Sequence, residues 1–439
     1  MFTLKPAQKT HAASVYRSLL TQGSALDTSD TGTGKTISSI AIARHWQDKG
    51  GLVAIVCPAS VVTAWGRAAT KQGVDPIFLT SYDKLRRGND YYSFRTQIRR
   101  NKKHKYFKAE FPDNTLVIFD EVHYCRGDNT QNAKLLVATK NAGAAVLTLS
   151  ATAARDPSQM KALGYVLGLH DHHKNTKNSW FKWAKRNGCY QDQWFAWKFK
   201  KGFDLSPLRE DLYATRKIAH GMRVEDLGGH FKDTVVLEDL RNFPRVAGIY
   251  EEAGVDEDYV NSIILDLEVK KLDSASAAEE ALRGRQLAEL EKIPYFVEQA
   301  KLLLEEGRSP VVFLNFRESL SLFQESFPES GIIVGGQSSE DRQKTLDDFQ
   351  EDKIRVMAVS ASAGGTGVNL HDTNGNFPRV GLVSPSFSPF VFKQVLGRLP
   401  RLGMKTPCMY RVVVAANTIE EHVNRVCLQG TRNMEELFT

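Results

Sequence analysis

Short apolar runs separated by helical patterns extend along the whole chain, and this alternation restricts its fold more than any other feature. The runs are rich in Val, Ile, Leu and Phe without alternating polar residues, as expected of parallel strands that are covered on both faces. The pattern therefore predicts an α/β protein with mainly parallel sheets. The candidate strands form two sets, at residues 24–26, 52–57, 76–80, 116–119 and 145–149, then 311–315, 332–334, 355–359, 380–383 and 410–414.

A long helical stretch at residues 256–306 lies between the two sets of strands. Because 439 residues exceed one ordinary hydrophobic core, we expect more than one domain. We predict two similar lobes, residues 1–240 and 241–439, each a mainly parallel sheet with helices on both faces.

Composition excludes several classes of protein. With 42% hydrophobic residues, 25% charged residues and 15 prolines, the chain is neither disordered nor fibrous. Apolar runs stay far below the ~18 residues of a membrane span, and the amino terminus lacks a secretory signal, so we expect no membrane contact and a cytoplasmic location. The five cysteines are far apart and form no CxxC pair, which argues against a zinc, iron–sulfur or disulfide framework.

Positive charge is concentrated in two segments. The whole chain carries +7, whereas residues 84–108 hold ten Lys/Arg against one acid and residues 174–201 hold eight against one. The remainder of the chain is mildly acidic. Two basic patches on an acidic body fit a nucleic-acid binder with a defined track, and the alternative is a pair of solvated surface loops.

Residues 29–36 read Ser-Asp-Thr-Gly-Thr-Gly-Lys-Thr, between the candidate strand at 24–26 and a helical pattern that begins at Ile37. Glycines allow backbone N–H groups to approach phosphates, Lys35 would reach the β- and γ-phosphates, and the Thr36 hydroxyl would ligate Mg²⁺. A serine replaces the first glycine of the strict pattern. The residues expected to bind the nucleotide here are Thr31, Gly32, Thr33, Gly34, Lys35 and Thr36.

Two adjacent carboxylates, Asp120 and Glu121, follow the candidate strand at 116–119. The carboxyl ends of parallel strands meet at one edge of a sheet, so this pair should lie near the phosphate loop. Asp120 would hold Mg²⁺ through water, and Glu121 would orient and deprotonate the attacking water. Together, the loop and the acidic pair predict a nucleoside triphosphatase.

Arg398 and Arg401 lie near the carboxyl terminus, with the spacing that places two residues on one face of a helix. An arginine brought to the γ-phosphate stabilises charge in the transition state. Because these arginines belong to the second lobe, hydrolysis would then require closure of the lobes. The alternative is a pair of surface arginines.

Additional segments give the chain a resemblance to the superfamily 2 helicases, and within them to the Snf2-like double-stranded-DNA translocases, across nearly its whole length. The segments are 4–8 (opening motif), 55–58 with Trp65 (motif Ia), 80–83 (motif Ib), 120–123 (DEAH-like box), 150–152 (motif III), 313–316 (motif IV), 360–370 (motif V), 394–401 (motif VI) and 418–421 (a helix start).

The resemblance implies two RecA-like lobes with an ATP site in the cleft between them. It implies that Gln8 reads adenine and that Gly367 also belongs to the nucleotide site. The resemblance also implies that four residues couple hydrolysis to movement: His123, Ser150, Thr152 and Gln394. The residues that it places near the nucleic-acid track are Pro58, Ser60, Thr80, Ser81, Gly365 and Thr366.

The chain departs from the Snf2 pattern at several points. Residues 150–152 read Ser-Ala-Thr, as in general helicases, and Pro400 and Met404 replace the usual histidine and glutamine of motif VI. The helical insertions of chromatin remodellers are missing. The chain therefore resembles the compact motors of viruses and phages, including phage branch-migration helicases.

A basic run lies between motif Ib and the acidic box, and we predict that it grips DNA. Its candidate contacts are Arg99, Arg100, Lys102 and Lys103. A second segment, residues 193–202, places Phe195, Trp197 and Phe199 on one face of a strand. It is either one arm of a hairpin laid over the core, or a wedge in which Trp197 and Phe199 stack on a base at a fork.

Together these features predict a monomeric motor that uses ATP and Mg²⁺ to unwind or branch-migrate forked or four-way DNA without strong sequence preference. We expect it in the cytoplasm, or in the host cytoplasm if it comes from a phage or virus. The alternatives are a duplex translocase that strips proteins from DNA, an RNA helicase, and a DNA-binding switch that does not hydrolyse ATP.

Overall fold

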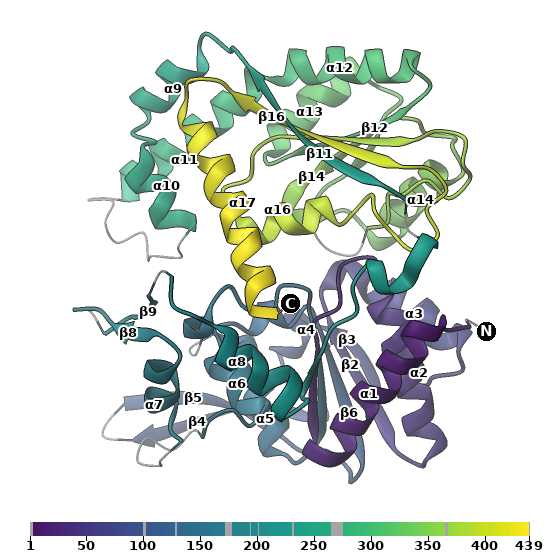
Figure 1. Cartoon of the computed structure of the whole chain (residues 1–439), viewed down its shortest axis with the longest axis vertical. Coiled ribbons are helices and arrows are strands. Elements are labelled where there is room, and N and C mark those ends of the chain that lie inside the picture. Colours follow the sequence, from purple (N-terminus) through teal and green to yellow (C-terminus); the bar gives the residue numbers. More distant parts are fainter. Residues whose placement is uncertain are drawn as a thin grey trace. The chain divides into compact units, whose positions relative to one another are not determined.

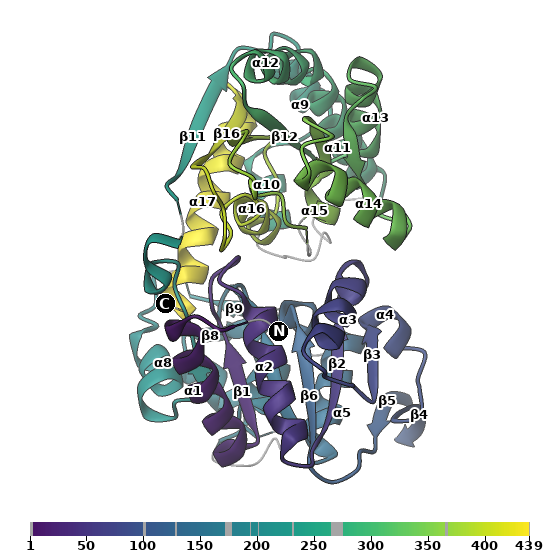
Figure 2. The ribbon, with the colours of Figure 1, turned by 90° about the vertical axis from the view of Figure 1, so that its right-hand side faces the viewer.

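The computed structural model describes residues 3–99, 102–127, 130–171, 178–193, 195–200, 202–230, 232–264, 275–364 and 368–438. The chain forms two compact units that divide between Leu227 and Gly228, and residues from Asn433 onward group with the first unit. Each unit contains one large sheet with helices on both faces (Figures 1 and 2). The predicted α/β class with two parallel-sheet lobes is confirmed.

The first unit is built on a six-stranded parallel sheet with the order β10-β1-β7-β6-β2-β3. All five candidate strands of the first set are present, each within two residues of its expected bounds. The two-residue strand β10 has too short an apolar run to be recognised from the sequence. The strands are β1 Ser24–Asp27, β2 Leu52–Cys57, β3 Phe78–Ser81, β6 Thr115–Asp120, β7 Ala145–Leu149 and β10 Ala219–His220.

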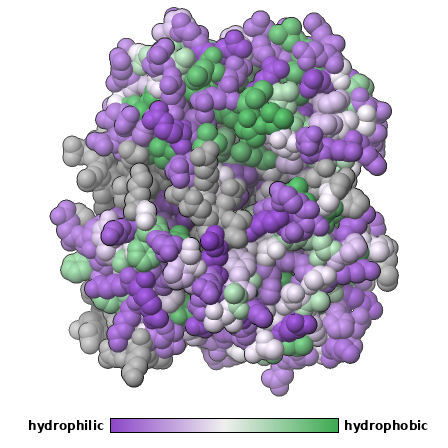
Figure 3. All heavy atoms as spheres, viewed as in Figure 1, coloured by the Kyte–Doolittle hydropathy of each residue, from purple (hydrophilic) through white to green (hydrophobic). Residues whose placement is uncertain are grey.

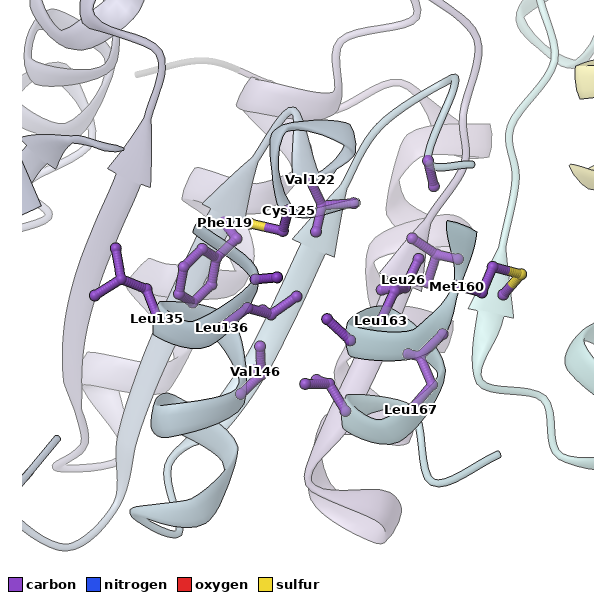
Figure 4. Packing of buried hydrophobic residues seen from close by; sticks show 14 of the residues in the cluster. Leu26, Phe119, Val122, Cys125, Leu135, Leu136, Val146, Met160, Leu163 and Leu167 are labelled. Carbon is purple, nitrogen blue, oxygen red and sulfur yellow. The ribbon is translucent and has the colours of Figure 1, made fainter. Parts of the chain in front are cut away.

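Helices cover both faces of this sheet because its strands are apolar on both sides. On one face the core is formed by α1 (Pro6–Gln22), α2 (Lys35–Asp48) and α3 (Val62–Lys71). On the other face, α5 (Gln131–Asn141) and α6 (Lys161–Val166) pack their leucines against Leu26, Phe119 and Val146 (Figure 4). The other helices and helical turns of the unit are α4 Tyr82–Leu85, α7 Trp180–Arg186, α8 Ser206–Glu210, η1 Ala59–Val61, η2 Val122–Cys125, η3 Pro157–Gln159, η4 Asp211–Thr215 and η5 Glu225–His230.

Two small antiparallel hairpins are added to the first unit, and both fall in the basic segments of the sequence. In the first, β4 (Tyr92–Arg99) pairs with β5 (Lys102–Ala109), and buried Tyr92 and Phe107 anchor it in the core. In the second, β8 (Cys189–Gln191) pairs with β9 (Trp197–Phe199). The hairpin interpretation of the aromatic segment is therefore confirmed.

The second unit repeats the design with a six-stranded parallel sheet of order β11-β16-β15-β12-β14-β13. The five candidate strands of the second set are again present. The strands are β11 Thr234–Arg241, β12 Ser309–Leu314, β13 Gly331–Ile333, β14 Met357–Ser360, β15 Arg379–Val383 and β16 Cys408–Ala415. The helices are α9 Val246–Glu252, α10 Glu257–Ile264, α11 Ala275–Leu290, α12 Ile293–Glu305, α13 Arg317–Ser326, α14 Ser339–Gln350, α15 Ala361–Gly364, α16 Pro389–Leu396 and α17 Ile419–Phe438.

The edge strand β11 shows where the predicted domain boundary differs from the structure. A division at residue 240 assigns β11 to the first lobe, whereas all its residues pair in parallel with β16 of the second sheet. Its apolar side chains, Val235, Val236, Leu237 and Leu240, are exposed, and hydrophobic surface covers this part of the unit in Figure 3. A strand with polar and apolar residues mixed and with little burial lacks the signal of a core strand.

A buried ion pair fixes the start of α17 in the second unit. Lys292 Nζ lies 2.6 Å from Glu420 Oε1, and both side chains are almost fully buried. The same carboxylate accepts hydrogen bonds from the Tyr250 hydroxyl at 2.8 Å and from the Ala415 backbone N–H at 2.9 Å. The helix start expected at residues 418–421 is thus anchored to the residue that precedes α12 and to the end of β16.

We predict that Lys292→Met lowers the free energy of unfolding of the chain by about 3–5 kcal/mol, because it leaves the Glu420 carboxylate buried without its cation. The double variant Lys292→Met/Glu420→Gln removes both charges and should recover more than half of that loss. Urea denaturation of the two variants and the parent measures this. Equal destabilisation by the single and double changes would contradict a coupled pair.

Candidate functional site

The sequence motifs of the first unit meet at one edge of its sheet. In the strand register, Leu149 at the end of β7 lies between Asp27 of β1 and Asp120 of β6. The phosphate loop follows β1, the Ser-Ala-Thr segment follows β7, and Glu121 follows β6. Three segments that are far apart in the sequence are therefore adjacent at the carboxyl edge, the position at which parallel sheets bind ligands.

The phosphate loop has the backbone that its glycines predict. Gly32 and Gly34 have φ angles of 87° and 95°, which side-chain-bearing residues rarely adopt. Lys35 begins α2, and its Nζ donates to the carbonyl oxygens of Ser29 at 2.7 Å and Asp30 at 3.1 Å. A helix that begins directly after a left-handed glycine directs its free N–H groups into the loop, and this arrangement fits a phosphate.

Gln8 joins α1 to the phosphate loop. Its amide Nε2 donates to the carbonyl oxygen of Thr33 at 2.9 Å, and its Oε1 accepts from the Lys5 backbone N–H at 3.0 Å. A Cβ added at Gly34 would lie 2.5 Å from that same Nε2. A glycine at position 34 is therefore required both by its φ angle and by the close approach of Gln8.

A buried ion pair lies beneath the loop. His11 Nε2 is 3.0 Å from Asp27 Oδ2, and Asp27 Oδ1 accepts from the Ser29 backbone N–H at 2.9 Å. Burial alone would raise the pKa of Asp27, but the contact with His11 and the charge of Lys35 hold it below its ordinary value. Nearby His220 has a pKa lowered to about 4, first by burial and then by the charge of His11.

Asp120 is oriented by groups from two other elements. The indole Nε1 of Trp65 on α3 donates to Asp120 Oδ2 at 2.8 Å, and the Tyr82 hydroxyl donates to the Asp120 carbonyl oxygen at 2.8 Å. Burial, followed by the charge of Glu121, raises the pKa of Asp120 to about 7, while Trp65 and Lys35 oppose the rise. A cation beside this carboxylate would offset that cost of burial.

The residues present fit a magnesium ion. The hydroxyl of Thr36 and the carboxylate of Asp120 supply the oxygen ligands that Mg²⁺ prefers. The strand register places the ends of β1 and β6 at one edge of the sheet, so the phosphate loop and the acidic pair belong to one site. Within the described part of the chain, no group of three or more His, Cys, Asp or Glu side chains forms an all-protein metal site, and the five cysteines are buried and unbridged.

A hydrogen-bond network connects the acidic box to the Ser-Ala-Thr segment. Glu121 Oε2 lies 3.1 Å from His123 Nδ1 and accepts from the Ser150 hydroxyl at 3.3 Å. His123 Nδ1 also lies 3.1 Å from Ser150 Oγ, which accepts from the Thr152 backbone N–H at 3.1 Å. Glu121 itself has a left-handed φ of 54°. The structure thus brings together three residues that the sequence predicts for coupling.

The residues expected along the nucleic-acid track follow the next two strands of the same edge. Pro58 and Ser60 follow β2, while Thr80 and Ser81 end β3. The Ser81 hydroxyl accepts from the Lys84 backbone N–H at 3.3 Å and caps α4, and its side chain is buried. Their role in binding remains a prediction.

The second unit contains the remaining motif residues, and one expectation about them is wrong. Arg398 and Arg401 do not share a helix face, because α16 ends at Leu396 and both arginines lie in the irregular segment that follows. Gly397 ends the helix, and Pro400 disfavours helical backbone at the residue before it. Buried Arg398 donates to the Val368 carbonyl oxygen at 3.4 Å, and Gln394 is buried on α16.

Several predicted residues lie outside the described residues. These are Arg100, Gly365, Thr366 and Gly367, and for Arg99, Lys102 and Lys103 only the backbone is described.

Sequence reasoning missed two contacts of the site, the His11–Asp27 pair and the support of Asp120 by Trp65. Both join residues that are distant in the sequence, and no local spacing signals them.

Comparisons with known proteins identify the family of the chain. A model of the helicase conserved C-terminal domain matches residues 291–403, and a model of the type III restriction enzyme res subunit matches residues 1–155. A protein of Acanthamoeba polyphaga mimivirus that bears the name of an ATP-dependent RNA helicase is 30% identical over 441 residues, which cover 94% of this chain and 79% of the viral protein. The chain belongs to the Snf2-like helicases of superfamily 2. It is an ATP hydrolase.

Other relatives of this helicase match smaller parts of it. DNA repair and recombination protein RAD54 of Saccharomyces cerevisiae is 25% identical over 50% of this chain and 24% of its own length. Protein CHROMATIN REMODELING 24 of Arabidopsis thaliana is 29% identical over 30% of this chain and 12% of its own length. A solved Sulfolobus solfataricus SWI2/SNF2 ATPase core in complex with dsDNA aligns with 99% of this chain and 96% of its own, at 16% identity and a TM-score of 0.37.

We predict that His11→Leu destabilises the chain in a pH-dependent way. In the parent, the depressed pKa of Asp27 contributes stability at neutral pH that is lost as pH falls through that pKa. Without His11, burial should raise the pKa above its unfolded value, so the ionised carboxylate should cost about 3–5 kcal/mol at neutral pH. The deficit, meaning the free energy of unfolding that the variant lacks relative to the parent, should shrink toward about pH 4, where Asp27 binds a proton.

Urea denaturation of parent and His11→Leu at both pH values measures this deficit. The double variant His11→Leu/Asp27→Leu serves as the matched control. It lacks only the stability that ionised Asp27 gives the parent and carries no buried unpaired charge, so its deficit at neutral pH should be smaller than that of His11→Leu. A deficit of equal size at both pH values would show that His11 acts through packing alone.

Proposed function

We propose that this helicase is an ATP- and Mg²⁺-dependent motor that unwinds or branch-migrates forked and four-way DNA, and that it acts as a monomer. The observation that most supports a motor is the network from Glu121 through His123 and Ser150 to Thr152. The carboxylate that would activate water is tied to the segment after β7. A change at the γ-phosphate that moves Glu121 would therefore also move the segment that follows β7.

The same network argues against a switch that binds ATP without hydrolysing it. A switch needs the phosphate loop and a magnesium ligand, but it does not need a water-activating carboxylate held in a strained left-handed backbone. Two groups from different segments, His123 and Ser150, hold Glu121 in place. Such positioning is expected where the carboxylate takes part in chemistry.

DNA is the preferred substrate because motif V resembles the Snf2 form and because relatives are named for DNA repair, recombination and chromatin remodelling. The name of the viral relative supports RNA as the second candidate.

Backbone amides and small polar side chains such as Ser60 and Thr80 suit phosphates rather than bases. We therefore propose weak sequence preference and strong dependence of binding on salt.

No helix within the described ranges is long and apolar enough to cross a membrane. We propose that the motor acts in the cytoplasm, and in the cytoplasm of the host if the protein is viral, as its viral relative is.

The proposed function predicts ATP-dependent strand displacement from a labelled DNA fork and a four-way junction, but not from a blunt duplex. The same substrates made of RNA test the second candidate. Displacement of RNA alone would reverse the substrate assignment. DNA-stimulated ATP hydrolysis without displaced strands would instead support a translocase that remodels protein–DNA complexes.

We predict that Lys35→Ala and Glu121→Gln each lower the rate of ATP hydrolysis by at least about 100-fold, because one removes the phosphate-binding cation and the other the general base. DNA binding without ATP should change by no more than a few fold in either variant. Glu121→Gln should still bind nucleotide, whereas Lys35→Ala should bind it weakly. Steady-state ATPase assays and nucleotide titration separate the two, and unaltered hydrolysis in Lys35→Ala would refute the assigned loop.

A further inference from the structure

The hairpin β8–β9 has an inner and an outer face that the strand register defines. Cys189 pairs with Phe199, Tyr190 with Lys198, and Gln191 with Trp197. Directly opposed residues of an antiparallel pair point to the same face, and successive residues alternate. Cys189, Phe199 and Trp197 therefore share the inner face, and Tyr190 and Lys198 share the outer face.

The inner face is part of the protein core. Cys189 is buried, and Trp197 and Phe199 pack against the first core cluster. The Trp197 ring lies 5.7 Å from that of Trp180 and 5.4 Å from that of Phe181, both edge to face. Trp197 thus anchors the hairpin on α7. The exposed aromatic rings are elsewhere on the segment.

Among the described residues of this segment, three aromatic side chains are exposed to solvent. Phe195 at the turn of the hairpin is 80% exposed, Tyr190 on the outer face is 50% exposed, and Phe181 on α7 is 44% exposed. Figure 1 shows α7, β8 and β9 together at the margin of the first unit. Because the ring of Phe195 buries little area, it adds little to folding stability.

The turn holds Phe195 in a conformation that is unfavourable for a bulky residue. Its φ is 61°, which is uncommon for a side chain of this size. The turn is closed by Asp192, whose carbonyl oxygen accepts from the Phe195 N–H at 3.0 Å and whose Oδ1 accepts from the Ala196 N–H at 2.9 Å. A strained backbone that presents an exposed ring indicates a use for that ring.

The segment that carries these rings is rich in cations. Within residues 178–193 and 195–200 the segment carries Lys182, Lys185, Arg186, Lys198 and Lys200 against a single acid, Asp192, which gives 5 − 1 = +4. Lys185 Nζ lies 4.6 Å from the centre of the Phe181 ring, and Lys198 Nζ lies 4.0 Å from Asp192. Aromatic rings among cations match a ligand that has both flat apolar faces and negative charge.

Single-stranded nucleic acid has both properties, because its unpaired bases present π-faces and its backbone is anionic. Duplex DNA has the charge but keeps its bases stacked inside. We infer that the outer face and turn of the hairpin, with Tyr190 and Phe195, bind a single strand by stacking, with Phe195 as the principal contact. The inference deepens the proposed function and rests on it, since a single strand at this surface is the product of unwinding.

The test compares Phe195→Asn with Phe195→Trp in the full chain. Asparagine tolerates the left-handed backbone, so the first variant removes the ring but keeps the turn, and the second keeps a stacking ring. Anisotropy titrations without ATP would use a labelled single-stranded oligonucleotide and a blunt duplex. We expect Phe195→Asn to weaken single-strand binding by roughly ten-fold, Phe195→Trp to bind like the parent, and duplex binding to stay within two-fold.

Equal single-strand affinity of Phe195→Asn and the parent would overturn the inference. So would an equal loss of single-strand and duplex affinity, which would assign the surface to phosphate contacts in general. The melting temperature of Phe195→Asn should match or exceed that of the parent, whereas Trp197→Ala should lower it because that ring is in the core. Strand displacement by the parent is scored separately, so failure of the proposed function is distinguishable from failure of the stacking surface.

Discussion

The parallel register of β1, β7 and β6 is the constraint on which the ATP site depends. It places Asp27, Leu149 and Asp120 side by side, so the loops that leave the three strands begin at the same level. A shift of one residue in any strand would exchange the side chains that pack against α1, α2 and α3 with those that pack against α5 and α6. The register is held because both faces of these strands are buried in apolar cores.

Around this edge, the polar groups that the site needs are supported from inside the protein. Asp120 is held by Trp65 and Tyr82, Glu121 by His123 and Ser150, and the start of the phosphate loop by Asp27. Burial makes each of these contacts stronger and makes the loss of any partner costly. The arrangement therefore lowers the stability of the chain somewhat, and it positions the side chains of the site before the nucleotide binds.

Much of this organisation could be predicted from the sequence, because parallel strands are continuous apolar runs and the phosphate loop is a local pattern. The strand ends at Asp120 and Ser150 followed from those runs, and the loop that carries Lys35 followed from its glycine pattern. The support of Asp120 by Trp65 could not be predicted, since it depends on how α3 packs on the sheet. The aromatic segment shows the same limit, because alternation grouped Phe195 with Trp197, whereas the turn at Asp192 separates the two rings.

The pairing of β11 with β16 decides how the chain can be divided into fragments for separate study. Strand β16 is almost fully buried along its length, and β11 covers its outer edge. A fragment that begins at residue 241 would expose that edge as a template for pairing with other chains, and aggregation would follow. A fragment that begins at Gly228 retains its own edge strand, so the natural point of division precedes β11.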